Sequence, residues 1–150
     1  GVEGEERGQS EAIARNLAVM SSLKTKILVV VSGEGGSGGA LALGVGDHIA
    51  ILEYGTYSVA SPEACASIVW RESDQAPRAA EAMKVGANDL KKIGIVDEII
   101  AEPIGGAHQD YDTISASIKL SLLTNLAELS KFSEEELLQR RYQRLLKIGA

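Results

Sequence analysis

An apolar run that passes directly into a glycine cluster restricts the fold of this chain more than any other segment. Residues 27–31 are Ile-Leu-Val-Val-Val, without alternating polar residues, which favours a strand buried on both faces of a parallel sheet. Residues 33–39 contain five glycines, and the small and apolar residues 40–43 predict the start of a buried helix. A buried strand, a glycine turn and a helix in this order predict an α/β fold.

The glycines of this turn predict a site for negative charge. Glycine has no side chain, so the backbone can approach a ligand closely, and the free N–H groups at the start of a helix point at that ligand. Such a turn can hold a bound anion or an oxyanion that forms during a reaction. A tight structural turn without chemistry is the alternative.

A dinucleotide is one anion that the spacing allows. Residues 33–38 formally satisfy Gly-x-Gly-x-x-Gly, and Glu53 lies ~20 residues further on, where a ribose-binding acid is expected. No Gly-Lys-Ser or Gly-Lys-Thr sequence follows the glycines, which excludes a Walker loop. The pattern alone does not exclude a nucleotide.

Five segments resemble, in the same order, motifs of the carboxyltransferase alpha subunit of multi-subunit acetyl-CoA carboxylase. They are Glu5-Glu6-Arg7-Gly8-Gln9-Ser10-Glu11-Ala12-Ile13-Ala14, Gly33-Glu34-Gly35-Gly36-Ser37-Gly38-Gly39-Ala40-Leu41-Ala42, Tyr57-Ser58-Val59-Ala60-Ser61-Pro62-Glu63, Glu102-Pro103-Ile104-Gly105-Gly106-Ala107-His108 and Arg140-Arg141-Tyr142-Gln143-Arg144-Leu145. The resemblance covers essentially the whole chain. It implies a crotonase-like fold of the ClpP/crotonase superfamily and an oxyanion site in place of a dinucleotide site.

The resemblance also implies how the chain is organised. Residues 1–150 would be the C-terminal part of one crotonase-like carboxyltransferase domain, with residues 112–150 as its C-terminal helical extension. Because the chain starts at Gly1 and the resemblance begins inside a loop, we expect a fragment that lacks roughly the N-terminal half of the family's chain. One of the family's two active-site loops would lie in that half, so we expect the fragment alone to be inactive.

The implied reaction transfers a carboxyl group from carboxybiotin, carried on a protein, to acetyl-CoA, giving malonyl-CoA for fatty-acid biosynthesis. Negative charge develops on a biotin oxygen and on an enolate oxygen, and backbone N–H groups can stabilise both without a titrating side chain. We expect Gly38 and Gly39 to be the catalytic oxyanion donors, serving biotin in preference to the enolate. Gly35, Gly36 and Ser37 are expected to shape the biotin-binding turn. Gly44, further into the helix, is expected to tolerate alanine if space allows, because alanine is the better helix former.

The resemblance implies partners as well. A homologous beta subunit would supply the other half-site in an α2β2 heterotetramer and would hold the family's zinc, and biotin carboxyl carrier protein and biotin carboxylase would complete the complex. One cysteine and two distant histidines offer no zinc site in this chain. A net charge of −6 makes nucleic acid an unfavourable partner, and no apolar run approaches the ~20 residues of a membrane span. We expect a bacterial cytoplasmic protein or a protein of the plastid stroma.

The remaining pattern predicts further helices and strands. Helices are expected over 5–22, from Ser61, and over 74–85, 89–93, 113–130 and 133–148, and strands over 47–53, 56–60 and 95–101. The caps of these helices are expected at Ser61 and Asn88, and as a capping box at Ser133 with Glu136, while Gly94 and Gly149 close two of them.

Several reactive residue types have a simpler structural interpretation. Cys65 has no histidine near it in the sequence, and His108 and His48 are lone histidines that more often serve structure than catalysis. The basic cluster at Arg140, Arg141, Arg144 and Lys147 is expected to be a solvated helix end whose charge suits the negative end of the dipole, and a contact to the phosphates of coenzyme A is the alternative.

Two other functions fit parts of the pattern. A crotonase-type hydratase or isomerase would need a carboxylate in the pocket, for which Glu34 and Glu63 are the nearest candidates. A non-catalytic assembly domain would have a glycine loop without chemistry.

Overall fold

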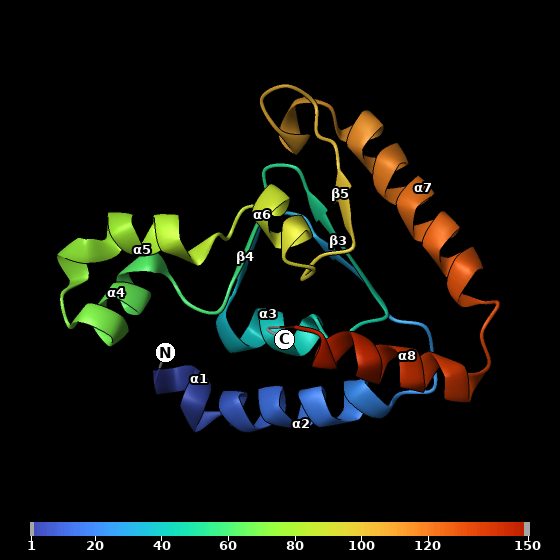
Figure 1. The fold of residues 1–150 in the computed structure, drawn as a ribbon, viewed down its shortest axis with the longest axis horizontal. Coiled ribbons are helices and arrows are strands. Elements are labelled where there is room, and N and C mark those ends of the chain that lie inside the picture. Colours follow the sequence, from blue (N-terminus) through green and yellow to red (C-terminus); the bar gives the residue numbers. More distant parts are fainter. Residues whose placement is uncertain (1, 149–150) are drawn as a thin grey trace.

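The computed structural model describes residues 2–148 and contains an α/β fold around a small parallel sheet (Figure 1). The central sheet has the order β1-β3-β5, with β1 at Leu28–Val31, β3 at His48–Leu52 and β5 at Glu98–Ile100. All its pairings are parallel, with Val29 opposite Ile49 and Ile51 opposite Ile99. The expected parallel strand is therefore confirmed, but of the four residues of β1 only Val31 is fully buried.

A second sheet continues from the carboxyl ends of the first. It pairs β2 (Glu34–Gly36) with β4 (Thr56–Ser58) in parallel, so that Gly35 lies opposite Tyr57. Each strand of this pair follows a strand of the central sheet after a short turn. The two sheets bring the glycine segment next to β4, which lies 20 or so residues further along the chain.

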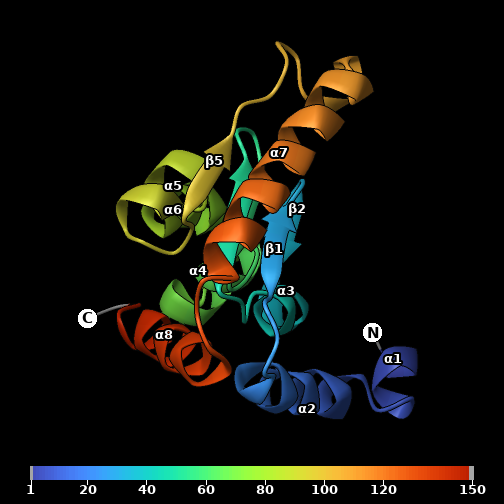
Figure 2. The same cartoon turned by 90° about the vertical axis from the view of Figure 1, so that its right-hand side faces the viewer.

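Helices cover both faces of the central sheet, which explains why β3 lacks polar alternation. Ile49 and Ile51 pack against α6 (Ala87–Lys92) on one face. Ala50 and Leu52 pack against α7 (Tyr111–Leu129) on the other, and Figure 2 shows α7 crossing that face. Both sets of side chains are therefore removed from water.

A third group of helices lies along the edge where the central strands begin. It contains α1 (Val2–Glu6), α2 (Gln9–Ser22), α3 (Ser37–Leu43) and α8 (Glu134–Leu146). In it α2 contacts both α3 and α8, which brings the two ends of the described chain to the same side (Figure 1).

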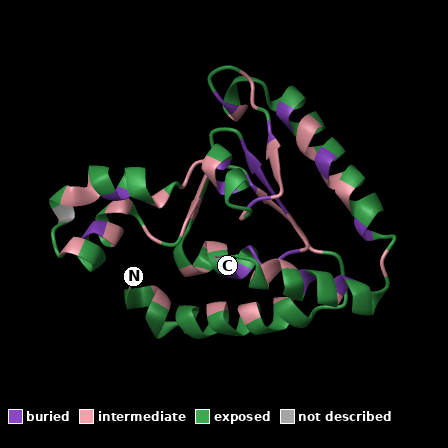
Figure 3. Ribbon diagram, viewed as in Figure 1, coloured by how far each residue is buried: buried purple, intermediate pink, exposed green. Residues whose placement is uncertain are grey.

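A hairpin of two helices projects from this body. It contains α4 (Pro62–Trp70), the 3-10 turn η1 (Ser73–Gln75) and α5 (Ala76–Met83), which pack on each other through Ala66 and Ala79. Its outward surface is largely exposed (Figure 3), and this surface includes Ile68 at 76% exposure. A short 3-10 turn, η2 (Ala107–Gln109), leads into α7.

The expected helices are present, with shifted ends. The single helix expected over 5–22 is divided, because Gly8 adopts a left-handed φ of 76° between α1 and α2. The cap expected at Asn88 is wrong, since Gly86 caps α6, whereas Gly94 does follow the helix with φ of 76°. The capping box of Ser133 and Glu136 is confirmed. The closure expected at Gly149 lies outside the described residues.

No helix among residues 2–148 is long and apolar enough to cross a membrane.

Candidate active site

The glycine cluster forms a short strand followed by a helix, which differs from the single turn expected. Gly35 and Gly36 lie in β2, and α3 begins at Ser37, three residues before the expected start at Ala40. The expectation failed because β4 supplies pairing partners for these residues, and only long-range contacts reveal that. Ser37 has a φ of 56°, the left-handed value at which the chain turns from strand to helix.

Tyr57 on β4 explains two of the glycines. A Cβ at Gly35 would lie 2.7 Å from Tyr57 Cδ2, and a Cβ at Gly44 would lie 2.1 Å from Tyr57 Oη. The Tyr57 hydroxyl donates a hydrogen bond to the Ala40 carbonyl in α3 at 3.1 Å. The ring therefore fixes α3 on the β2–β4 sheet and occupies the space that an alanine side chain would need at Gly44.

The start of α3 leaves two backbone donors without a side-chain cap. Its N-cap residue is Gly36, which is extended and makes no side-chain cap hydrogen bond. A capping side chain would normally accept from the second or third N–H of the helix, and in α3 these belong to Gly38 and Gly39. Both residues chosen from the sequence as oxyanion donors are therefore brought to one uncapped helix end.

The surroundings of the two donors differ. Gly38 is half-buried against α2, where an added Cβ would lie 3.6 Å from Ile13 Cγ2. Gly39 is exposed, and an added Cβ would meet nothing within 4 Å. Neither residue has a positive φ, so the backbone itself would accept other residue types at both positions. Glycine at 39 leaves space for a ligand beside the N–H groups.

α2 is held beside this helix by Arg141, a residue that sequence reasoning assigned to a solvated helix end. Arg141 is 1% exposed and lies within hydrogen-bond distance of Asp47, whose side chain is 2% exposed. Its remaining N–H groups donate to the carbonyls of Met20, Leu23 and Thr25, at the end of α2 and in the segment that follows it, at 2.7–2.8 Å. All five guanidinium N–H groups are thus used.

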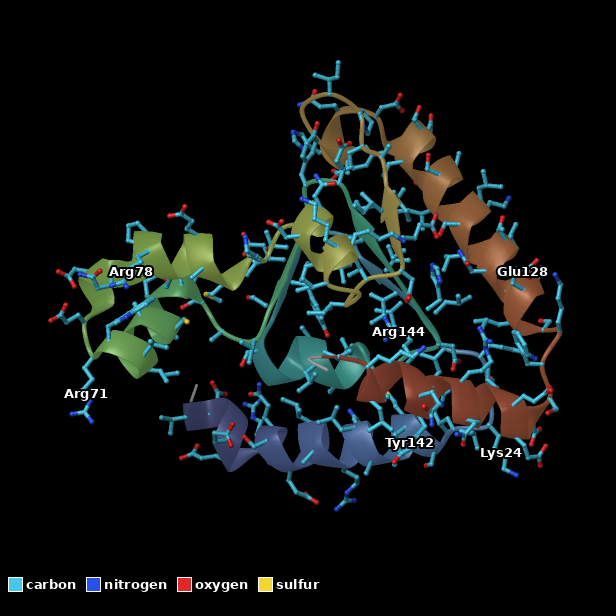
Figure 4. The ribbon with its side chains drawn as sticks, viewed as in Figure 1. Lys24, Arg71, Arg78, Glu128, Tyr142 and Arg144 are labelled. Atoms are coloured by element: carbon cyan, nitrogen blue, oxygen red, sulfur yellow. The ribbon has the colours of Figure 1, made fainter. Side chains whose placement is uncertain are left out.

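The helical spacing of residues along α8 could have predicted the burial of Arg141. Leu137, Arg141 and Arg144 lie at i, i+4 and i+7, on the face of α8 that turns inward. Arg144 extends from α8 toward the centre of the fold (Figure 4), where Nε donates to Asp97 Oδ2 and Nη2 donates to the Ile95 carbonyl at 2.8 Å. The expectation of a solvated basic cluster is therefore wrong for these two arginines.

A second polar cluster is centred on Glu98, and His48 has a structural contact in it. His48 Nε2 lies 3.0 Å from Glu98 Oε2, and the same oxygen accepts from Ser121 at 2.7 Å and Asn125 at 2.9 Å. Burial acts to raise the pKa of Glu98, but the hydrogen bonds from Ser121, His48 and Asn125 together hold this pKa below its ordinary value. The cluster attaches α7 to β3 and β5.

The other reactive residues are not gathered at α3. Cys65 is a free, half-buried thiol on the projecting helix α4, and His108 is exposed on η2. Glu34 and Glu63, the carboxylates considered for a hydratase, are both exposed. The N-cap expected at Ser61 is confirmed, with its hydroxyl oxygen accepting from the Ala64 N–H. Among residues 2–148 no group of three or more His, Cys, Asp and Glu side chains could hold a metal.

Comparison with known proteins gives the family. Residues 1–149 match the family described as acetyl co-enzyme A carboxylase carboxyltransferase-like. The chain belongs to this family. Three bacterial relatives, each named acetyl-coenzyme A carboxylase carboxyl transferase subunit alpha, align over 149 residues and 99% of the chain. They are from Photobacterium profundum (59% identical), Pseudoalteromonas atlantica (57%) and Vibrio cholerae (59%).

The chain spans about half the length of these relatives, since the alignment covers 47% of each. Membership of the acetyl co-enzyme A carboxylase carboxyltransferase-like family confirms the resemblance drawn from the five motifs. Glu53, the candidate ribose-binding acid of a dinucleotide site, has a structural contact, which agrees with this family. Glu53 Oε2 instead accepts from the Glu102 N–H at 3.1 Å, which joins two loops at the carboxyl edge of the sheet.

Proposed function

We propose that this chain carries one oxyanion site of a biotin-dependent carboxyltransferase, which transfers a carboxyl group to acetyl-CoA and yields malonyl-CoA. The fold would be part of a crotonase-like domain of the ClpP/crotonase superfamily. Residues 1–150 would be its C-terminal part, and residues 112–150, which include α7 and α8, its helical extension.

The uncapped start of α3 is the observation that carries this proposal. It offers the N–H groups of Gly38 and Gly39 at a helix end with positive dipole character, beside the open space at Gly39. Backbone donors suit a reaction in which charge develops on oxygen atoms, because they are oriented before the reaction starts. The absence of a histidine, cysteine or carboxylate cluster among the described residues at α3 is compatible with this chemistry, because the donors do not titrate.

The residues present fit a ureido or thioester oxygen, since both accept hydrogen bonds from N–H donors. Carboxybiotin on its carrier protein supplies the carboxyl group when it is bound. Gly38 and Gly39 would donate to the oxygen on which negative charge develops, which we assign to biotin in preference to the acetyl-CoA enolate. Gly35, Gly36 and Ser37 would hold the backbone path that leads into these donors.

Tyr57 and Arg141 would act as positioning residues. Tyr57 sets the position of α3 through the Ala40 carbonyl, and Arg141 sets the position of α2, whose Ile13 borders Gly38. Losing one oxyanion donor typically slows a reaction by ~100- to 1,000-fold. A shift of the helix could disturb both donors together.

The family implies the partners of this site. We propose a beta subunit that completes the catalytic pocket in an α2β2 assembly, a biotin carboxyl carrier protein that delivers biotin, and biotin carboxylase in the larger complex. A bacterial cytoplasm is the setting we propose, as the relatives are bacterial.

Malonyl-CoA decarboxylation, measured with biotin and the beta subunit, tests the proposal. The chain would be assayed alone and joined to the region that its relatives have in addition. Activity is expected only in the longer form, and Gly39→Val should reduce it by ~100- to 1,000-fold.

Gly33→Val is the matched control, because Gly33 has the same open surroundings and lies outside α3. It should keep most of the activity. Near-normal turnover of Gly39→Val, or equal losses in the two variants, would contradict the assignment. Hydration of an enoyl-CoA without biotin would instead support a hydratase.

A further inference from the structure

A cavity of about 450 Å³ lies beside α3, and its lining includes Ser37 at the start of this helix and Leu41 further along it. It is bounded by α3, β4, α6 and α8, with Leu41, Val45, Leu90 and Leu145 among its apolar lining. Its volume falls within the range of sites that hold small molecules. The lining is almost entirely aliphatic, so the cavity favours an aliphatic occupant.

Arg144 introduces a positive charge into this apolar lining. Its side chain is 14% exposed, and Asp97 and the Ile95 carbonyl engage Nε and Nη2. The third nitrogen, Nη1, is buried and has no hydrogen-bond partner among residues 2–148. One pair of N–H donors of a buried guanidinium therefore remains to be satisfied.

The positive charge of Arg144 also acts on Tyr57. Tyr57 also lines the cavity, and burial raises the pKa of its phenol, while the positive charge of Arg144 acts in the opposite direction. A buried donor without an acceptor is unfavourable, and it is more so when the group is charged. Arg144 is one of the residues that line the cavity, and an anionic acceptor beside Nη1 would satisfy this nitrogen.

We propose that this cavity binds a small aliphatic monocarboxylate, with its chain among Leu41, Val45 and Leu90 and its carboxylate accepting hydrogen bonds from Arg144 Nη1. Only one nitrogen of the guanidinium is left for a ligand, which favours a single carboxylate over a phosphate that needs several donors. An acyl thioester, in which no carboxylate ends the chain, would lack the charged contact. Ser37 and Tyr57 line this cavity as well, so it adjoins the proposed carboxyl-transfer site, and binding is measured directly instead of through turnover.

A series of ligands with equal chain length tests the charge requirement on the unaltered protein. Octanoate, octanol and octyltrimethylammonium would be titrated into the purified protein by isothermal calorimetry. Octanoate should bind saturably and roughly 10- to 150-fold more tightly than octanol, as expected for a hydrogen bond to a charged group. The cationic compound should not bind. Equal binding of octanoate and octanol, or no saturable binding of octanoate, would overturn the proposal.

Two variants locate the site. Arg144→Gln should weaken octanoate by roughly 10- to 150-fold and leave octanol unchanged. Val59 is 80% exposed at the open side of the cavity, so Val59→Trp should obstruct entry without repacking the core. Ile104→Trp, at a 97% exposed position outside the cavity, is the matched control. Unchanged octanoate binding in Val59→Trp, or equal weakening in Ile104→Trp, would place the ligand elsewhere and refute the assignment.

Discussion

Replacing Arg141 by methionine should destabilise the protein more than any other arginine substitution on α8. The change keeps an unbranched side chain but removes five hydrogen bonds. Asp47 would keep the Ile27 N–H as a donor but would lose its charged partner at 2% exposure. Breaking one side of a buried ion pair costs about 3–5 kcal/mol, because the remaining charge is left without compensation.

Urea denaturation followed by circular dichroism gives the free energy of unfolding for this comparison. A loss of about 3–5 kcal/mol is a large share of the ~5–15 kcal/mol that stabilises an ordinary domain. Arg140→Met is the matched control on the same helix, since Arg140 is exposed and stacks 4.1 Å from the Phe132 ring centroid. Losing an exposed cation–π contact should cost about 0.5–1 kcal/mol.

A double variant identifies the cause of the loss. Adding Asp47→Asn to Arg141→Met removes the uncompensated carboxylate. The double variant should therefore lose less free energy of unfolding than the two single variants lose in sum. If Arg141→Met costs no more than Arg140→Met, the guanidinium does not hold α2 in place. Strict additivity of the two changes would refute the role of the buried charge pair.

Three further predictions concern other contacts. Gly44→Ala should destabilise the protein by about 1–3 kcal/mol in urea unfolding, despite a gain of helix propensity of about 1 kcal/mol. Adding Tyr57→Phe removes the contacting hydroxyl and should restore part of this loss, and no restoration would place the clash elsewhere. In the longer form of the chain, Cys65→Ala should leave the proposed carboxyl transfer nearly unchanged, whereas a loss of several orders of magnitude would indicate a covalent mechanism. The lowered pKa of Glu98 makes its stabilising contribution complete above its ordinary value of 4.5 and lost as pH falls through the folded-state pKa. Unfolding free energies of Glu98→Gln should therefore vary less between about pH 6 and 3 than those of the unaltered protein, and an unchanged profile would contradict this.

Local patterns in the sequence predicted most of the elements, because their signals lie within a few residues. The apolar run before the glycines predicted β1, and Ser133 with Glu136 predicted the start of α8 through a contact of three residues' separation. The donors Gly38 and Gly39 were likewise chosen from local glycine spacing and a family resemblance. The uncapped end of α3 is compatible with that choice.

Contacts between distant segments were not predictable in the same way. β2 forms only because β4 lies beside it, so the segment around Gly35 was expected to be a turn. Arg141 looked like a residue of an exposed helix end, since its acceptors at Met20 and Asp47 lie 121 and 94 residues away. Propensity and charge patterns describe neighbours along the chain, whereas burial of this arginine depends on where α2 and β3 meet α8.

A site made of backbone donors depends on such distant contacts more than a side-chain site does. The Gly38 and Gly39 N–H groups point along the axis of α3. A helix of seven residues is not stable by itself in water, so its position depends on the elements that pack against it. Tyr57 holds α3 from the sheet side, and Ile13 borders it from α2, which Arg141 in turn attaches to Asp47, directly before β3. Substitutions at Tyr57 or Arg141 are therefore expected to lower the turnover of the proposed reaction, although neither side chain would contact the substrate. The substitution at Arg141 should also loosen the contact between α2 and α3.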